Sequence, residues 1–359
     1  MKYRGIILMA IVFMTSPLIA LISEMSYGRP MKITRNWKAV STADRAFQYV
    51  DDSTLISMDI LLLEDDGGLP EAYTTYIRTP VCDDTLCNLL HIQMYWNVLG
   101  NYLGFDTIAG ESLTKNDHLA FTNEDYDKLH QLLQDDNAVI KRKSKAELFD
   151  KTETRQSEVV DAVTGATALE VKEAVVDGAL YSCYTLYHLV YGEISDRIQL
   201  HTEELLDRGL TEKLLNSQYA DDQLYALKNL NEDDFLRYKE IILGLIESAI
   251  PLNRIYILKK MPKILWQDRE VQLKLGKYFM AMDVNSRTYV LNKLLDEDWI
   301  EPQSLNDMAN CLTELSKNQV KSLSAILAKN EEVIWSSTRM RIDSIVNGGQ
   351  FRYDYLLQP

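Results

Sequence analysis

The sequence lacks the short motifs that mark the most common enzyme classes. It contains no Gly-x-Gly-x-x-Gly, Walker, His-Glu-x-x-His or Gly-x-Ser-x-Gly string among its 359 residues. Dinucleotide-binding folds, phosphate-binding loops, zinc proteases and serine hydrolases therefore have no motif in their favour. Its five histidines are scattered without the spacing of metal ligands. Hydrolysis and metal catalysis are left without a candidate site.

Basic residues are also in short supply. The chain has 38 lysines and arginines against 53 aspartates and glutamates, which gives a formal net charge of −15. A surface of this charge is repelled by nucleic acids and anionic membranes at long range, so no nucleic-acid partner is expected. With 46% apolar and 25% charged residues the composition is globular, and the length is sufficient for two domains with separate cores.

The long hydrophobic run of the chain lies at its N-terminus. Lys2 and Arg4 precede an apolar stretch interrupted at Pro17, which is the layout of an export signal within residues 1–28. We expect cleavage, because the run is marginal for a hydrocarbon core of about 30 Å; a retained N-terminal anchor is the alternative. No cysteine lies near the end of the run, which excludes a bacterial lipoprotein. The protein is expected to be exported and to work in the periplasm or elsewhere outside the cytoplasm.

Cysteine is rare, with four residues in the chain. In an exported protein, the close pair Cys82 and Cys87 indicates a disulfide that closes a small loop rather than a metal site. A metal site usually has a shorter spacing between its cysteines and a second pair. A reversible redox dithiol and two unpaired thiols are the alternatives. Cys183 and Cys311 lie in apolar, helical surroundings and are expected to be small core residues.

Residues 32–195 carry mixed signals that predict an α+β domain. The stretches 54–63 and 88–105 are rich in β-branched, aromatic and leucine residues and predict strands of a small antiparallel sheet. Residues 121–135 predict a helix with Thr122 as its N-cap, and residues 144–150 predict a short second helix. A long apolar helix is expected from Ala168 to Gly192, packed against the sheet.

Residues 197–359 predict helices alone, with a loose internal repeat. Four similar segments have central leucines that are 31, 33 and 32 residues apart, namely Leu227, Leu258, Leu291 and Leu323. A helical hairpin of this length cannot bury its apolar stripe alone, so neighbouring hairpins must stack. We therefore expect a solenoid-like, HEAT-like helical-repeat domain. An ordinary helical bundle with similar spacing is the alternative.

Thr164-Gly165-Ala166-Thr167 stands directly before the expected long helix. The first backbone N–H groups of a helix lack intrahelical partners and, together with the helix dipole, suit a phosphate group. Gly165 permits close approach of the backbone, and Asp161 can accept N–H bonds within the preceding turn. The alternative is an ordinary N-cap, since Thr167 and Glu170 have the spacing of a capping box.

The nine residues 161–169, DAVTGATAL, resemble the flavinylation motif of a known family. This family comprises the FMN-binding domains of Na⁺-translocating NADH:quinone reductase, Rnf-type complexes and NosR-type regulators. Its motif is roughly Asp-Gly/Ala-x-Ser/Thr-Gly-Ala-Thr-x-Ser/Thr. The matching positions are Asp161, Ala162, Thr164, Gly165, Ala166 and Thr167. Leu169 departs from the usual Ser or Thr, which weakens the phosphate pocket or recognition by the transferase but leaves the acceptor hydroxyl intact.

The resemblance implies a specific modification and function. In the family, a flavin transferase joins FMN through its phosphate to the threonine that corresponds to Thr167, and the other matching residues form the surrounding site. An exported flavoprotein that relays electrons between membrane or periplasmic redox partners is implied, rather than a stand-alone enzyme. The competing function is an exported helical-repeat scaffold with a degenerate, flavin-free domain, and a thiol–disulfide protein using Cys82 and Cys87 is a third.

Aromatic and basic clusters are further candidates for contact with a flavin. An aromatic stripe at helical spacing favours plain core over flavin stacking; it consists of Tyr181, Tyr184, Tyr187, His188 and Tyr191. The same holds for three residues of one expected strand, His91, Tyr95 and Trp96. The basic cluster Lys141–Lys145 either neutralises a flavin phosphate or forms a solvated face, and its shortness favours the solvated face.

Overall fold

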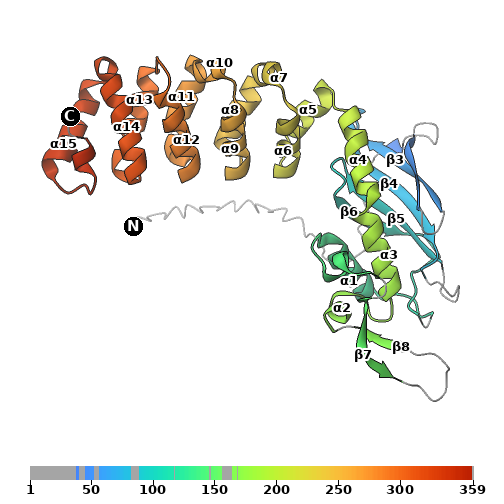
Figure 1. Ribbon diagram of the computed structural model, residues 1–359. Helices are drawn as coiled ribbons and strands as arrows, with labels where there is room; N and C mark the ends of the chain where they lie inside the picture. The colour runs from blue at the N-terminus through green and yellow to red at the C-terminus, as the bar shows by residue number, and fades with distance from the viewer. Residues whose placement is uncertain are drawn as a thin grey trace, which may run out of the picture.

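The computed structural model begins with a sheet and continues with helices (Figure 1). This order confirms the predicted layout of an α+β part followed by an all-α part. The leader, the pair Cys82 and Cys87, and the motif residues Asp161 and Ala162 lie outside the described residues. The described residues are 38–39, 45–51, 56–81, 89–116, 118–144, 147–155, 164–167 and 169–357.

The main sheet is antiparallel and has the strand order β1-β3-β4-β5-β6, with β2 also paired to β3. The predicted strands at 54–63 and 88–105 are confirmed as β3 and the β5–β6 hairpin. Because a strand is pleated, alternate side chains share a face, and Ile92, Met94 and Trp96 of β5 are all fully buried on one face. The strands are β1 (Lys38–Ala39), β2 (Arg45–Val50), β3 (Ser57–Glu64), β4 (Pro70–Thr79), β5 (Leu90–Asn97) and β6 (Tyr102–Thr107).

Helices α3 (Leu180–Val190) and α4 (Glu193–Glu204) run across one face of this sheet (Figure 1). The indole N–H of Trp96 donates to the carbonyl of Val190 at 3.1 Å, which fixes α3 on the sheet. Helix α1 (Asn123–Gln134) packs against both α3 and β6. The predicted N-cap is confirmed, since Thr122 accepts from the backbone N–H of Asp125 in a complete capping box.

The single helix predicted from Ala168 to Gly192 is wrong, because the chain forms two helices there. Helix α2 (Leu169–Ala174) has six residues, and α3 begins only at Leu180. Between them Gly178 adopts a φ of +70°, a left-handed conformation that favours glycine. The Gly178 carbonyl accepts from the backbone N–H of Asn116 at 2.7 Å, so a contact from a distant segment holds the break in place.

The short helix predicted at 144–150 is also wrong at its end, where a strand begins. Strand β7 (Phe149–Arg155) pairs antiparallel with β8 (Thr164–Thr167) in a separate two-stranded sheet. The pairing runs from Phe149 opposite Thr167 to Arg155 opposite Thr164. In Figure 1 this small sheet extends away from the six-stranded one.

Described residues after Arg197 form helices and turns without any strand, as predicted. Helices α6, α9, α12 and α14 lie side by side in chain order, and α8, α11 and α13 form a second row. All four leucines with the regular spacing are fully buried. The helices are α5 (Arg208–Leu215), α6 (Ala220–Asn229), α7 (Glu232–Arg237), α8 (Lys239–Ser248), α9 (Pro251–Lys260), α10 (Lys263–Trp266), α11 (Arg269–Tyr278), α12 (Val284–Leu295), α13 (Pro302–Ala309), α14 (Lys317–Lys329) and α15 (Ser336–Gly348).

Polar contacts tie the first of these helices to the sheet. Lys213 of α5 pairs with Asp65 at 2.7 Å and with Glu71 at 2.5 Å, on both sides of the β3–β4 turn. On α4, His201 Nδ1 lies 2.9 Å from the buried hydroxyl of Tyr73. The sheet and the row of helices therefore meet at a hydrogen-bonded junction rather than at a bare linker.

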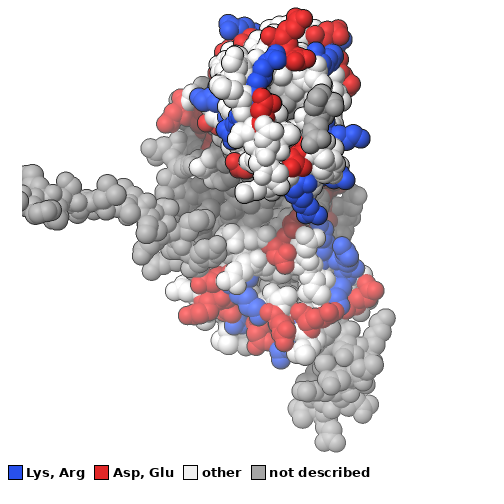
Figure 2. Space-filling model, turned by 90° about the vertical axis from the view of Figure 1, so that its left-hand side faces the viewer, with Lys and Arg blue, Asp and Glu red and all other residues white. Residues whose placement is uncertain are grey.

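Charged side chains of both signs are intermixed on the face shown in Figure 2. Among the described residues of that face, neither sign forms a broad surface of its own. Within the part of the chain that the structure describes, no helix has the length and apolar character needed to span a bilayer.

Candidate functional site

The motif residues 164–167 form strand β8, whose last residue is Thr167. The register with β7 is interrupted between Asp150 and Thr154, so β8 is a short and irregular pairing partner. Helix α2 begins at Leu169, two residues after the proposed acceptor. A helix of six residues has a much smaller dipole than the long helix predicted from the sequence. The long helix on which the expected anion site was based is therefore absent at this point, and the site keeps only the support of a six-residue helix.

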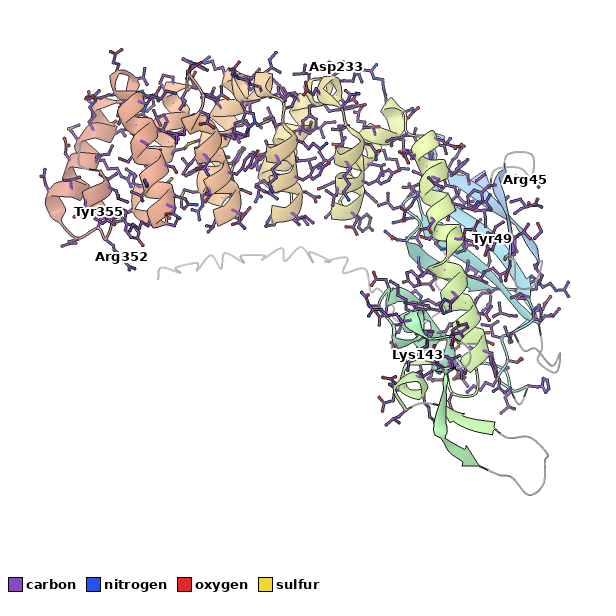
Figure 3. The ribbon with its side chains drawn as sticks, viewed as in Figure 1. Arg45, Tyr49, Lys143, Asp233, Arg352 and Tyr355 are labelled. Carbon is purple, nitrogen blue, oxygen red and sulfur yellow. The ribbon has the colours of Figure 1, made fainter. Side chains whose placement is uncertain are left out.

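A basic side chain nevertheless lies close to the start of α2. The ammonium of Lys143 forms an ion pair with the carboxylate of Glu170, three residues after Thr167 (Figure 3). The Lys143 side chain is 24% exposed, whereas that of Glu170 is 62% exposed. Lys141 instead donates to the carbonyl of Asp136 at 2.6 Å. Among the described residues of the predicted basic cluster, Lys143 thus contacts the start of α2 and Lys141 does not.

A cavity of about 480 Å³ opens between α1, α2 and the 3₁₀ turn η2 (Val139–Arg142). This volume is in the range of cofactor sites. Its wall combines aliphatic side chains with one ammonium and three carboxylates. Among the described residues, the lining consists of Lys128, Gln131, Leu132, Asp135, Ala138, Val139, Glu170, Glu173 and Ala174.

Sequence reasoning missed the cavity residues outside the motif, above all Lys128 and Glu173. They come from two segments that are more than forty residues apart in the chain. Helical periodicity gives a partial signal, because Lys128, Gln131 and Asp135 share one face of the predicted helix 121–135. The signal does not tell which other segment covers that face.

The tyrosine stripe of α3 packs against the core, with Tyr187 fully buried and Tyr181, Tyr184 and Tyr191 partly buried. Tyr187 is fully buried and its hydroxyl donates to the carbonyl of Asp135 at 2.9 Å. Tyr191 donates likewise to the carbonyl of Leu133 at 2.7 Å. Burial raises the pKa of Tyr187 to about 12, so it stays protonated and holds the end of α1.

His188 differs from these tyrosines because part of its imidazole is left without a partner. Its ring centroid lies 4.2 Å from that of Tyr184, and burial lowers the pKa of the His188 imidazole. The buried Nε2 atom has no hydrogen-bond partner among the described residues. A neutral imidazole packed in this way is a stacking partner for Tyr184 and not a proton donor at neutral pH.

The three candidates on β5 have separate structural tasks. Trp96 is fully buried and bonded to α3, whereas Tyr95 donates to Asp106 at 3.0 Å. His91 Nδ1 lies 2.8 Å from a carboxylate oxygen of Glu111. None of the three belongs to the described lining of the cavity beside α2.

Thiol and metal chemistry gain little from the described residues. Cys183 is fully buried, and burial raises the pKa of its thiol to about 12, which makes it an inert core residue as predicted. Cys311 is a free thiol of intermediate exposure. The described part contains no cluster of three or more His, Cys, Asp or Glu side chains suited to a metal ion.

Comparison of the chain with protein family models, with curated proteins and with solved structures finds no match.

Proposed function

We propose that this chain is an exported electron-transfer flavoprotein that carries FMN on Thr167 through a phosphoester bond. The observation that carries the proposal is the position of the motif. Residues 164–167 lead into α2, and Glu170 and Glu173 of α2 line a cavity of about 480 Å³. A motif that leads directly into a helix lining a cofactor-sized cavity supports a flavin tethered at that point of the chain.

The charges near the motif support the proposal only in part. A phosphodiester on Thr167 keeps one negative charge, and Lys143, which pairs with Glu170 three residues further on, is the nearby cation we propose to balance it. The cavity wall itself has three carboxylates against one ammonium. Lys128 in the cavity wall would be the ammonium available to a flavin held there. When bound, FMN supplies one- or two-electron transfer; the chain orients the ring and limits its contact with water. A flavin transferase is the implied modifying enzyme, and membrane or periplasmic redox proteins are the implied partners.

For the helical part we propose a solenoid-like repeat domain that serves as a docking surface. The parallel order of α6, α9, α12 and α14 supports this, as does the full burial of the leucine at the same position in each. Each of these helices packs against its neighbours in the row, which is the nearest-neighbour pattern of repeat proteins.

The competing proposal is a scaffold whose first domain carries no flavin. A specific observation favours it: Leu169 stands where the family has a hydroxyl residue, and its side chain is 72% exposed. An exposed leucine offers no hydrogen bond to a phosphate and leaves an apolar spot where a transferase has to dock.

Intact mass and in-gel flavin fluorescence distinguish the two proposals. The chain is co-expressed with a flavin transferase and sent through the export route. We expect the wild type to gain the mass of FMN minus water, and Thr167→Ala to remain unmodified, because alanine has no hydroxyl to take the phosphoryl group. Thr154→Ala on the facing strand β7 is the matched control and should keep its flavin. A wild-type chain that stays colourless at its unmodified mass leaves the scaffold as the better account.

A further inference from the structure

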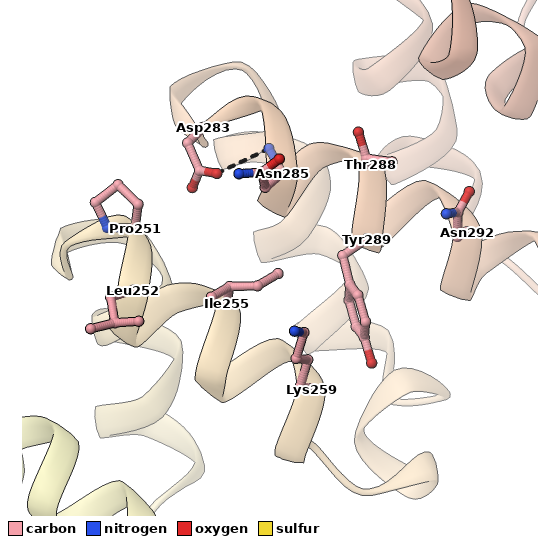
Figure 4. Close-up of a pocket in the computed structure, with 9 residues that line it drawn as sticks. All are labelled: Pro251, Leu252, Ile255, Lys259, Asp283, Asn285, Thr288, Tyr289 and Asn292. Carbon is pink, nitrogen blue, oxygen red and sulfur yellow. Dashed lines mark hydrogen bonds between the residues drawn. The ribbon is translucent and has the colours of Figure 1, made fainter.

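A second cavity lies far along the chain from the motif, between helices α9 and α12 (Figure 4). Its volume is about 540 Å³, and it opens to solvent. Its lining consists of Pro251, Leu252, Ile255, Lys259, Asp283, Asn285, Thr288, Tyr289 and Asn292. We call this cavity the α9–α12 groove. It has room for one large side chain and the polypeptide that carries it.

The groove has an apolar centre that the fold itself does not require. Figure 4 shows Ile255 of α9 and Tyr289 of α12 facing each other from the two helices. Leu252 in the lining is 59% exposed. The contact between α9 and α12 is already made by leucines that are fully buried. Apolar side chains that remain exposed around a cavity mark a binding surface.

The negative charge of the groove is already compensated. Asp283 Oδ1 accepts from the backbone N–H groups of Asn285 and Ser286, each at 3.0 Å. Its Oδ2 accepts from the Ser286 hydroxyl at 2.6 Å and pairs with Arg254 at 3.4 Å. Asp283 therefore acts as a helix cap, tied to its own helix and to α9.

The positive charge of the groove is uncompensated. Lys259 is exposed and forms no ion pair with any carboxylate of the described residues. Lys293, one turn beyond Tyr289 and outside the lining of the groove, places its ammonium 6.0 Å from the centre of the Tyr289 ring. The side-chain amide oxygen of Asn292 accepts from the Ser322 hydroxyl at 3.2 Å, which leaves the amide N–H groups of Asn292 to donate elsewhere.

We propose that the α9–α12 groove binds an acidic segment of a partner protein. A large apolar side chain of that segment lies between Ile255 and Tyr289, and a neighbouring Asp or Glu pairs with Lys259. Asn292 donates to a backbone carbonyl of the bound segment. A single ammonium with amide donors suits a carboxylate, whereas a phosphate favours the bidentate fork of arginine. The chain has a net charge of −15, so recognition depends on this local contact and not on long-range attraction.

The test uses the full exported chain and a display library of random dodecapeptides. We expect selection to enrich peptides that carry an acidic residue next to a large apolar one. A synthetic peptide of the selected sequence should lose about tenfold in affinity for Lys259→Glu and for Ile255→Ser. Both positions leave the buried leucines untouched, so circular dichroism should show wild-type helix content. Selection repeated on Lys259→Glu should enrich lysine or arginine in place of the acid.

Lys228→Glu is the matched control, because Lys228 occupies the same position of α6 and lies outside the groove. Its affinity should stay within about twofold of the wild type. Absence of any enriched sequence overturns the proposal. The proposal is also overturned if selection on Lys259→Glu still enriches acidic residues. An equal loss of affinity in Lys228→Glu overturns it as well, because that result indicates general electrostatics. A Thr167→Ala chain should bind equally well, so failure here is separate from failure of the flavin proposal.

Discussion

Arg254 of α9 joins the end of α8 to the start of α12, and its replacement by methionine tests how these helices are held together. Only 7% of the residue is exposed. Its guanidinium donates to the carbonyls of Ile246 at 2.7 Å, Ala249 at 2.9 Å and Glu247 at 3.2 Å, which are the last acceptors of α8. It also reaches Asp283 at the start of α12 at 3.4 Å.

Arg254→Met keeps most of the side-chain length but removes every one of these donors. Charged hydrogen bonds contribute roughly 1.5–3 kcal/mol each, and water entering the helix ends recovers part of the loss. Truncating one member of a buried charged network costs about 3–5 kcal/mol. We therefore expect the free energy of unfolding to fall by about 3 kcal/mol, as measured by urea titration and circular dichroism.

The matched control is Arg287→Met, at the equivalent position of α12. The guanidinium of Arg287 makes one weak contact, to the sulfur of Met280 at 3.4 Å, and its buried Nε has no partner among the described residues. This substitution should cost about 1 kcal/mol or less. An equal loss for Arg254→Met and Arg287→Met refutes the conclusion that the α8 carbonyls and Asp283 depend on Arg254.

Two further substitutions test packing and pH dependence. In Gly276→Ala the new Cβ lies 2.6 Å from the Cα of Ser304, so α11 and α13 must separate. We expect the free energy of unfolding to fall by about 2 kcal/mol, as measured by thermal melts. The control is Gly244→Ala, whose new Cβ meets no atom within 4 Å and which should be neutral or stabilising. The hydrogen bond from Lys213 holds the pKa of the Asp65 carboxyl below its ordinary value of 3.8. The Lys213–Asp65 pair therefore contributes its full stability above pH 3.8 and loses it as the pH falls through the lowered pKa of Asp65. Lys213→Met should be less stable than the wild type at neutral pH and should lose less on acidification below about pH 4; parallel curves for the two proteins contradict this.

Local signals were sufficient for much of the fold. Thr122 marks its helix because a capping box is a contact within four residues, and β5 is recognised by the alternation of Ile92, Met94 and Trp96. The break at Gly178 depends on a hydrogen bond from Asn116, some sixty residues earlier, which no local pattern reveals.

Non-local pairing also explains the missed strand and the missed part of the site. Phe149 begins a strand because Thr167 pairs with it, although the residues before it resemble a helix start. Lys128 and Glu173 meet in one cavity through the packing of α1 and α2 around a turn. The motif predicted which segment carries the candidate site, whereas its surroundings depend on tertiary structure.

Strands β7 and β8 pair with each other and form a sheet separate from the six-stranded one. An isolated pair of strands is marginally stable in water, so it opens at a small fraction of the free energy of global unfolding. Under the proposed function, attachment of the flavin can therefore follow folding, because a transferase needs to engage only two short strands to reach Thr167. A chain that has folded but has not yet received the proposed flavin would then resist proteases as a folded protein does.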